Sequence, residues 1–348
     1  MAEELVKYSP AFKPQLAALR SPVFGGTSAF NAAYLEWKYE QNPYLNGPIM
    51  HLALMDDRVV GMRGIYGSKG HFGDVGQRVV PAAAEFAIDR DHRGRWLGQR
   101  LIAFAEEDLR AKGCDYVLSP SANLTTRFLR LQAGCRLAAT YQTFRRGNYP
   151  QPRNPRQRAN PNRPKFLTRA AHSFGNWLRN WKTPAPFEGF DKWAAQIRSP
   201  IVATPTPRIS QMSELVSQCR DQSRIQHVRD ERFYRWRLRD PSSLYRFVYY
   251  EDNGGMEGFV TLQQPVHGGV VTIVDWTAPT TNAWNSLLGA VVDSGIDRLQ
   301  ILSTRFSEAQ AQSLYRSGFE PVVDPDTRTH PAPGILLCPL SNPDTNAW

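Results

Sequence analysis

Short apolar runs separated by polar turns divide the first half of the chain into strands and helices. Alternating and continuous apolar runs predict strands at residues 4–8, 50–55, 58–66, 86–88, 115–119 and 137–146. Asp56-Asp57 predicts a tight hairpin turn, and the glycine-rich residues 67–76 predict a longer one. Helical spacing of apolar positions predicts helices over residues 28–41, 97–112 and 125–133.

The second half repeats this order of elements. A hairpin is predicted over Asn253-Gly254-Gly255, followed by a strand at 270–276, a helix at 282–295, a strand at 298–303 and a helix at 307–316. The segment LEWKYEQNPYL at 35–45 also has a counterpart, YRWRLRDPSSL at 234–244. Because 348 residues are many for one core, the repeat predicts two similar domains in tandem.

The net charge of +10 is concentrated in the segment between these halves. Residues 145–182 contain ten Lys or Arg and no Asp or Glu, and the rest of the chain has 32 basic and 32 acidic residues. Nucleic acid is therefore not the partner that we expect for the folded domains, since neither domain carries the excess.

The basic segment itself has two parts. Residues 147–164 are rich in Pro, Asn and Arg and predict a mobile linker. Residues 165–181 place Phe166, Phe174 and Trp177 with other apolar residues on one helical face beside basic residues. Such an amphipathic helix suits an anionic membrane surface, and it equally suits docking against a domain or a second copy.

The cysteines and the hydropathy suggest a cytoplasmic protein, peripheral at the inner membrane face if the amphipathic helix binds lipid. No apolar run approaches the roughly 20 residues of a membrane span, and the N-terminus lacks a signal-peptide pattern. Cys114, Cys135, Cys219 and Cys338 form no C-x-x-C pair. We therefore expect reduced, mostly buried thiols and no metal site.

Residues 85–100 (EFAIDRDHRGRWLGQR) combine a strand, a basic glycine-containing loop and the start of a helix. The free N–H groups of a first helical turn and the positive end of the helix dipole attract an anion to one spot. Arg93 and Arg95 add charge that suits a pyrophosphate. The stretch lacks the Lys-Ser/Thr of a Walker loop and the three glycines of a dinucleotide fingerprint, so it predicts another phosphate-bearing cofactor.

This stretch resembles motif A of the GNAT superfamily of acyl-CoA-dependent N-acyltransferases, in which Arg or Gln is followed by x-x-Gly-x-Gly/Ala. Arg93 fills the first position and Gly98 the last, while Trp96 stands at the middle glycine. Two helix C-termini also fit this family: the one at Gly134-Cys135 and the one within residues 313–321 (SLYRSGFEP). The resemblance implies an α/β (α+β) fold of two tandem GNAT-like domains, each a mixed, mostly antiparallel central sheet flanked by helices.

The resemblance also implies domain roles and a co-substrate. Residues 1–147 would bind acyl-CoA, 148–186 would be the basic linker with its helix, and 187–348 would be a degenerate second domain, because Thr-Ala-Pro-Thr-Thr-Asn at 277–282 lacks Arg and Gly. Trp96 would either point away from the phosphates or block them. The residues expected to bind acetyl-CoA or another acyl-CoA are Phe86, Ala87, Ile88, Arg93, Gly94, Arg95, Trp96, Leu97, Gly98, Gln99 and Asn123.

The implied reaction is direct attack of a primary amine on the acyl-CoA in a ternary complex. This chemistry needs a proton acceptor, and Glu85 is our first choice because apolar neighbours would raise its pKa. The alternative is a glutamate at the strand edge that is solvated or pairs with an arginine. Asp89 and His92 are weaker candidates for the base. The strand backbone near Ala87 or Ile88 would supply the oxyanion donor.

Two further expectations follow from the resemblance. Arg130 stands where the family often has the tyrosine that protonates the leaving thiolate; a guanidinium would stabilise that thiolate electrostatically instead. The aromatic residues of the 28–41 helix either pack in the core, as such stripes usually do, or wall the acceptor pocket through Tyr34, Trp37 and Tyr39.

The acceptor would be a small-molecule amine. The Trp-Lys-Tyr…Asn-Pro element resembles bacterial acyltransferases of amino sugars and surface polysaccharides. Two alternatives remain: a catalytically silent GNAT-fold binding protein, and a Fem-type transferase that uses aminoacyl-tRNA.

Overall fold

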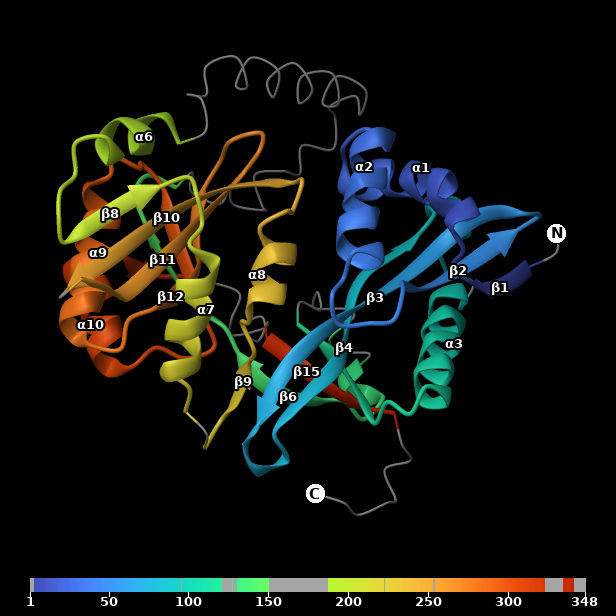
Figure 1. Cartoon of the computed structure of the whole chain (residues 1–348). Helices are drawn as coiled ribbons and strands as arrows, with labels where there is room; N and C mark the ends of the chain where they lie inside the picture. The colour runs from blue at the N-terminus through green and yellow to red at the C-terminus, as the bar shows by residue number, and fades with distance from the viewer. Residues whose placement is uncertain are drawn as a thin grey trace, which may run out of the picture.

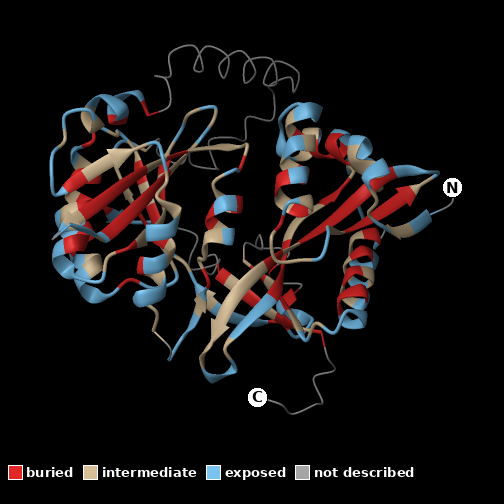
Figure 2. Cartoon of the chain, viewed as in Figure 1, coloured by how far each residue is buried: buried red, intermediate tan, exposed pale blue. Residues whose placement is uncertain are grey.

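The computed structural model describes residues 3–94, 96–120, 127, 130–149, 187–221, 223–252, 254–322 and 334–340. Two mixed sheets, each flanked by helices, form the two halves of the molecule (Figure 1). Their buried residues line the strands and the helix faces that pack on them (Figure 2). This is the fold class that the sequence predicts.

The first sheet orders its strands β1-β2-β3-β4-β5-β15-β6, with β9 paired to β3. The strands are β1 (Glu3–Lys7), β2 (Ile49–Met55), β3 (Arg58–Phe72), β4 (Gln77–Ile88), β5 (Tyr116–Ser119), β6 (Arg136–Thr140), β9 (Ile225–His227) and β15 (Gly334–Pro339). Only β4 and β5 run parallel, and they share the single pair Ala82 and Leu118. Beyond residue 82 the two strands therefore diverge and leave an opening in the sheet.

Helices cover this sheet where apolar positions recur at helical spacing. They are α1 (Lys13–Phe24), α2 (Ser28–Leu35), the π-helical turn η2 (Glu36–Glu40) and α3 (Leu97–Ala111), with short 3-10 turns η1 (Pro10–Phe12), η3 (Gly73–Val75) and η4 (Arg90–His92). The side chain of Thr27 caps α2 by accepting from Phe30 N. Leu16, Leu35 and Tyr39 bury their side chains against β2 and β3.

The second sheet is ordered β14-β7-β13-β12-β11-β10-β8. Its strands are β7 (Gln142–Arg146), β8 (Ile201–Thr204), β10 (Ser243–Asp252), β11 (Gly255–Pro265), β12 (Val271–Thr277), β13 (Leu299–Ser303) and β14 (Glu320–Pro321). Its helices are α6 (Glu188–Ala194), α7 (Ile209–Gln218), α8 (Glu231–Arg237), α9 (Thr281–Asp293) and α10 (Glu308–Arg316). The parallel strands β12 and β13 pair only over residues 271–273 and 299–301, so this sheet has the same kind of opening.

The halves exchange strands. β7 belongs to the second sheet, whereas β9 and β15 belong to the first, and Figure 1 shows β15 beside β6. The prediction of one strand over 137–146 is wrong, because β6 and β7 enter different sheets. The predicted turn at 67–76 is also shorter, since β3 extends to Phe72. The domain boundaries at 147 and 187 remain predictions, and both sheets draw strands from across them.

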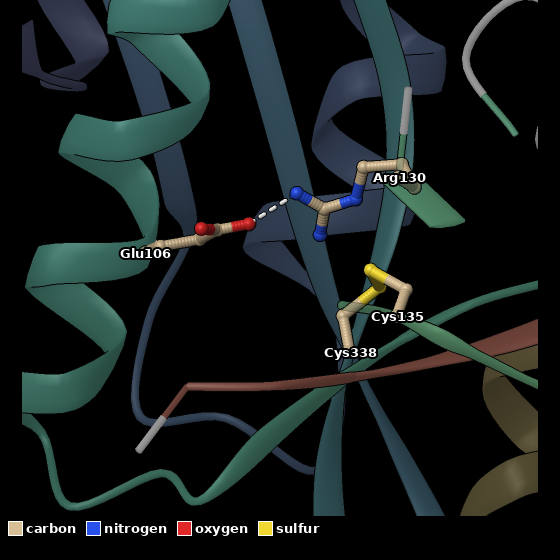
Figure 3. Close-up of a disulfide and its surroundings, with 4 residues drawn as sticks. All are labelled: Glu106, Arg130, Cys135 and Cys338. Carbon is tan, nitrogen blue, oxygen red and sulfur yellow. Dashed lines mark hydrogen bonds and ion pairs between the residues drawn. A yellow bond between two sulfur atoms is a disulfide. The ribbon is translucent and has the colours of Figure 1, made fainter. Parts of the chain in front are cut away.

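Cys135 and Cys338 form a disulfide, so the expectation of four reduced thiols is wrong (Figure 3). Cys135 directly precedes β6 and Cys338 lies in β15, and 203 residues separate them in sequence. The pair could not be inferred from cysteine spacing, because only the exchange of β15 brings the two residues together. Cys114 and Cys219 are free.

The repeated Trp-Lys/Arg segment forms the contact between the halves. Trp37 of η2 stacks on Trp236 of α8, with ring centroids 5.3 Å apart and planes inclined by 12°. Trp37 Nε1 donates to Trp236 O at 2.7 Å, and Trp236 Nε1 donates to Trp37 O at 2.8 Å. For Trp37 the packing interpretation of the aromatic stripe is therefore confirmed, with the partner ring in the other half.

The same symmetry extends to the turns that follow. Asn42 Oδ1 accepts from Tyr44 N at 3.1 Å, and Asp240 Oδ1 accepts from Ser242 N at 2.9 Å. Each turn is thus closed by the side chain before its proline, which explains why Asn-Pro and Asp-Pro occupy equivalent positions. Tyr44 adds a bond across the interface by donating to Asp230 Oδ1 at 2.8 Å.

Among the described helices, none is long and apolar enough to cross a membrane. The predicted amphipathic helix at 165–181 and most of the predicted linker and of the 125–133 helix lie outside the described residues.

The tryptophan pair yields a double-mutant prediction. Trp37→Ala and Trp236→Ala should each lower the free energy of unfolding by about 3 kcal/mol, and the double mutant should lose at least about 1 kcal/mol less than the sum, because each single change already removes the shared contact. Urea unfolding measures all three. Trp193 packs inside the second half, so the losses of stability from Trp193→Ala and Trp37→Ala should be additive. Additivity of Trp37 with Trp236 would contradict the coupling.

Candidate functional site

β4, α3 and the loop between them border a groove of about 380 Å³. Arg130 forms its far wall. Of the predicted cofactor residues, the groove brings together Phe86, Ile88, Arg93, Gly94, Trp96, Leu97, Gly98 and Gln99. Ala87 is buried in the core packing of β3 and α1, so only its backbone remains a candidate. Arg95 and Asn123 lie outside the described residues.

The start of α3 is open to an anion. Trp96 at the N-cap makes no side-chain capping bond, and among the described residues the first turn is closed by bonds from Gln99 N and Arg100 N to Trp96 O. The preceding N–H groups and the positive dipole end face the loop. Arg93 Nε donates to Ile88 O at 3.0 Å, which ties the loop to the end of β4 and holds a cation beside the groove.

Backbone geometry explains the glycine pattern of the loop. A Cβ at residue 98 would come within 2.8 Å of Phe86 Cζ, so any other residue there would force the Phe86 ring to shift. Trp96 adopts φ 59° and ψ 0°, a left-handed conformation that favours glycine. Its side chain is 73% exposed and stands at the rim of the groove. The tryptophan thus occupies the position at the expense of backbone strain.

On one side along the groove, the backbone of β4 has no strand partner among the residues that the structure describes. Gly64 of β3 faces both Ala84 and Glu85, so β4 bulges at this point. Beyond Ala82 no described strand pairs with the β5 side of β4. Main-chain N–H and C=O groups there can bond an extended ligand.

Glu85 lies in a buried cluster of charged and phenolic side chains. Lys38 Nζ lies 3.0 Å and Arg20 Nη1 3.5 Å from Glu85 Oε1, and Tyr39 OH donates to Oε2. Tyr39 can reach the carboxylate because residue 64 is glycine; a Cβ there would overlap the phenol. Lys38 also donates to Tyr34 OH at 3.0 Å. The pairing alternative for Glu85 therefore has a lysine and an arginine as partners.

The expected rise in the Glu85 pKa is wrong. Burial by itself raises the pKa of this carboxyl, but the charges of Lys38 and Arg20 and the hydrogen bonds from Tyr39 and Lys38 outweigh burial and lower it to about 2. A carboxylate with so low a pKa is a poor proton acceptor. Asp89 is no better, since the Asp91 N–H also lowers its pKa.

Two buried arginines stand on the groove side of the sheet. Arg130 is 5% exposed and pairs with Glu106 of α3 (Figure 3). Its Nε and Nη2 are buried without a hydrogen bond to any described residue. Arg63 of β3 is 4% exposed and lies over the Phe86 ring at 5.8 Å. Burial, together with the charge of Arg130, lowers the pKa of Arg63 to about 10.

Arg20, Arg63 and Glu106 were not among the residues predicted from the sequence. A usable signal was present for the arginines, because each interrupts an otherwise apolar stretch, in QLAALRSPVF and RVVGMRGIY. A charge at such a position is buried with a partner or serves a site. Among the described residues, no three His, Cys, Asp or Glu side chains gather into a metal site.

Comparison with protein families finds the same family in both halves. Residues 15–129 match the model described as the Acetyltransferase (GNAT) family, and residues 226–314 match one described as an Acetyltransferase (GNAT) domain. The second match contains α8 and the opening between β12 and β13. No curated protein matches the sequence.

Solved structures share the whole fold. A conserved protein of unknown function from Enterococcus faecalis V583, described as a probable N-acyltransferase, superposes with TM-score 0.64 at 11% identity, covering 98% of this chain and 73% of that one. A GCN5-related N-acetyltransferase from Anabaena variabilis gives 0.58 at 14%, covering 98% and 73%. A tandem GNAT protein from the clavulanic acid biosynthesis pathway gives 0.55 at 12%, covering 99% and 100%. Identities this low establish the fold alone.

The Glu85 cluster predicts a pH-dependent stability. Because the folded pKa is about 2 and the ordinary value is 4.5, the carboxylate stabilises the fold fully above pH 4.5 and loses this effect as pH falls toward 2. Glu85→Gln should lower the free energy of unfolding by about 3 kcal/mol at pH 7 and by less than about half of that at pH 3. Urea unfolding across this range measures it, with exposed Glu257→Gln as control. A difference in unfolding free energy between wild type and Glu85→Gln that does not change with pH would contradict this prediction.

The strained backbone at residue 96 predicts that glycine is more stabilising than alanine there, the reverse of the usual order. Trp96→Gly should be more stable than Trp96→Ala by about 1 kcal/mol, since both lose the indole and only glycine adopts φ 59° without strain. At Tyr315, an exposed position inside α10, the order should reverse, because glycine is the poorer helix former. Thermal unfolding of the four variants decides, and alanine equal to glycine at position 96 would refute the strain.

Proposed function

We propose that this chain, which belongs to the GNAT acyltransferases through a domain in each half, transfers an acetyl group from acetyl-CoA to a primary amine in its first domain. The observation that carries this proposal is the groove beside α3. There an uncapped helix start, a basic loop and the free edge of β4 meet along one line.

The residues of the groove fit an acyl-CoA. The α3 N-terminus, Gly94 and Arg93 would hold the diphosphate, and the free edge of β4 would bond the amide groups of the pantetheine arm. Phe86 and Ile88 add apolar surface beside that edge. When bound, the co-substrate supplies a thioester carbonyl that is activated for attack.

In the proposed reaction the amine nitrogen bonds to the thioester carbon, and the carbon–sulfur bond breaks with its electron pair going to sulfur. Arg130 and Arg63 form a buried cationic pair that favours the negative sulfur electrostatically. Arginine cannot readily donate its proton, so the thiolate would be stabilised as an anion and protonated later by solvent. The backbone near Ala87 remains the proposed donor to the oxyanion.

We assign Glu85 to the acceptor side, in a role other than the one first expected. Its carboxylate is ionised throughout the physiological range and is compensated by Lys38 and Arg20, so it would hold Lys38 and Tyr39 in place beside the acceptor. The amine would lose its proton to water, because a carboxyl of pKa about 2 retains a proton only weakly.

The position of Trp37 also affects which acceptor we propose. Its ring and its N–H are engaged with Trp236, so the Trp-Lys-Tyr element that resembles amino-sugar acyltransferases serves the interface. The proposal therefore names a small primary amine, and an amino sugar or a surface-polysaccharide precursor is one example. Contact of residues 165–181 with an anionic membrane surface remains a prediction from the sequence.

A catalytically silent binding protein is the second candidate, favoured by Trp96 and Arg130, which depart from the family pattern at the loop and at the leaving-group position. A Fem-type transferase fits less well, because the basic loop at Arg93-Gly94 suits coenzyme A.

Calorimetry with acetyl-CoA tests the groove. Wild type should bind with a micromolar Kd, and Arg93→Glu should weaken binding by at least about tenfold, because it reverses the charge beside the diphosphate. Arg316→Glu, on an exposed position at the end of α10, is the matched control and should bind like wild type. Absence of binding by wild type would remove the proposal. Binding without release of free thiol in the presence of glucosamine and other primary amines would favour the silent protein.

A further inference from the structure

A second cavity, of about 930 Å³, lies where β12 and β13 diverge in the second domain. Trp276 and Thr277 from the end of β12 form one wall, and Thr304 and Arg305 after β13 form another. Lys69 and His71 of β3 close it from the first domain. The cavity thus occupies the opening that corresponds to the one between β4 and β5, but side chains from other elements line it.

The two carboxylates in this lining are already satisfied. Asp275 pairs with Arg229 and accepts from Tyr234 OH at 2.7 Å. Asp230 accepts from Tyr44 OH at 2.8 Å and from Phe233 N at 2.9 Å, and Lys69 Nζ lies 3.3 Å from its other oxygen. Neither carboxylate therefore presents an uncompensated negative charge to a ligand.

Basic side chains in the lining are compensated less fully, although the charge of Asp221 offsets part of that of Arg224 and Arg305. Arg220 and Arg305 line the cavity, and neither guanidinium makes a hydrogen bond or ion pair to a residue that the structure describes. Arg224 also lines it and shares a single ion pair with Asp221, at 2.7 Å. His71 Nδ1 is buried with no hydrogen-bond partner among the described residues. The cavity therefore carries an excess of positive charge and an unsatisfied buried polar atom.

We propose that this cavity binds a phosphorylated small molecule of nucleotide size, at a site separate from the acyl-CoA groove. Its volume lies within the range of small-molecule sites, and the planar fork of arginine matches phosphate oxygens. Trp276, whose ring stacks on Phe306 at 5.7 Å, provides an aromatic wall for a planar ring. The second domain is then a binding domain in its own right, whether or not the first domain transfers an acetyl group.

Calorimetry on the full chain with inorganic pyrophosphate, ADP and adenosine tests this site. Measurements in the Arg93→Glu background remove the contribution of the first-domain loop. Pyrophosphate and ADP should still bind there, and adenosine should bind at least about tenfold more weakly than ADP because it lacks the phosphates.

Adding Arg220→Ala and Arg305→Ala should weaken both phosphorylated probes by about tenfold or more. Arg305→Glu alone, at an exposed position, should weaken them in the same direction, and Arg316→Glu should not. Near-UV circular dichroism verifies that each variant is folded. Loss of all probe binding in Arg93→Glu, or unchanged binding in the Arg220/Arg305 variants, would overturn the proposal.

Discussion

The reciprocal contact of Trp37 and Trp236 holds the two domains in a fixed relation. Each indole covers the other ring and donates its N–H to the other residue's carbonyl, so both polar atoms are satisfied inside a buried interface. Because the two residues are equivalent positions of a repeat, the contact has the self-complementary form of a two-fold interface within a single chain. It joins η2 of the first domain to α8 of the second.

Similar architecture in the two domains supports different chemistry. Both sheets open where a parallel pair of strands diverges. The first opening meets a helix start without a side-chain cap and an Arg-Gly loop, whereas the second meets arginines from the loops that follow α7 and β13. The helix after the second opening is capped by Thr280, whose hydroxyl accepts from Ala283 N, so its start is already satisfied. The duplicated domains thus differ in where their positive charge comes from.

Local pattern predicted much of this fold. The hairpins, α3, α9, α10 and the equivalence of the two halves follow from periodicity and turn residues. The local pattern did not contain long-range pairings. Three features each depend on a partner about 150 to 200 residues away: the split between β6 and β7, the entry of β15 into the first sheet, and the Cys135–Cys338 bond. The motif named loop residues that line one groove in the structure, and their role in binding remains a proposal. The pKa of Glu85 was misjudged because its neighbours in sequence are apolar, whereas its neighbours in space are Lys38 and Arg20.

The placement of β15 also constrains the order in which the protein can fold. This strand lies between β5 and β6 and is held there by Cys338, yet it follows the whole second domain in the chain. During synthesis on the ribosome the first sheet therefore emerges with two facing edges unpaired, and exposed edges invite association with other chains. The first sheet, which borders the candidate groove, is therefore completed only after the whole second domain has been synthesised.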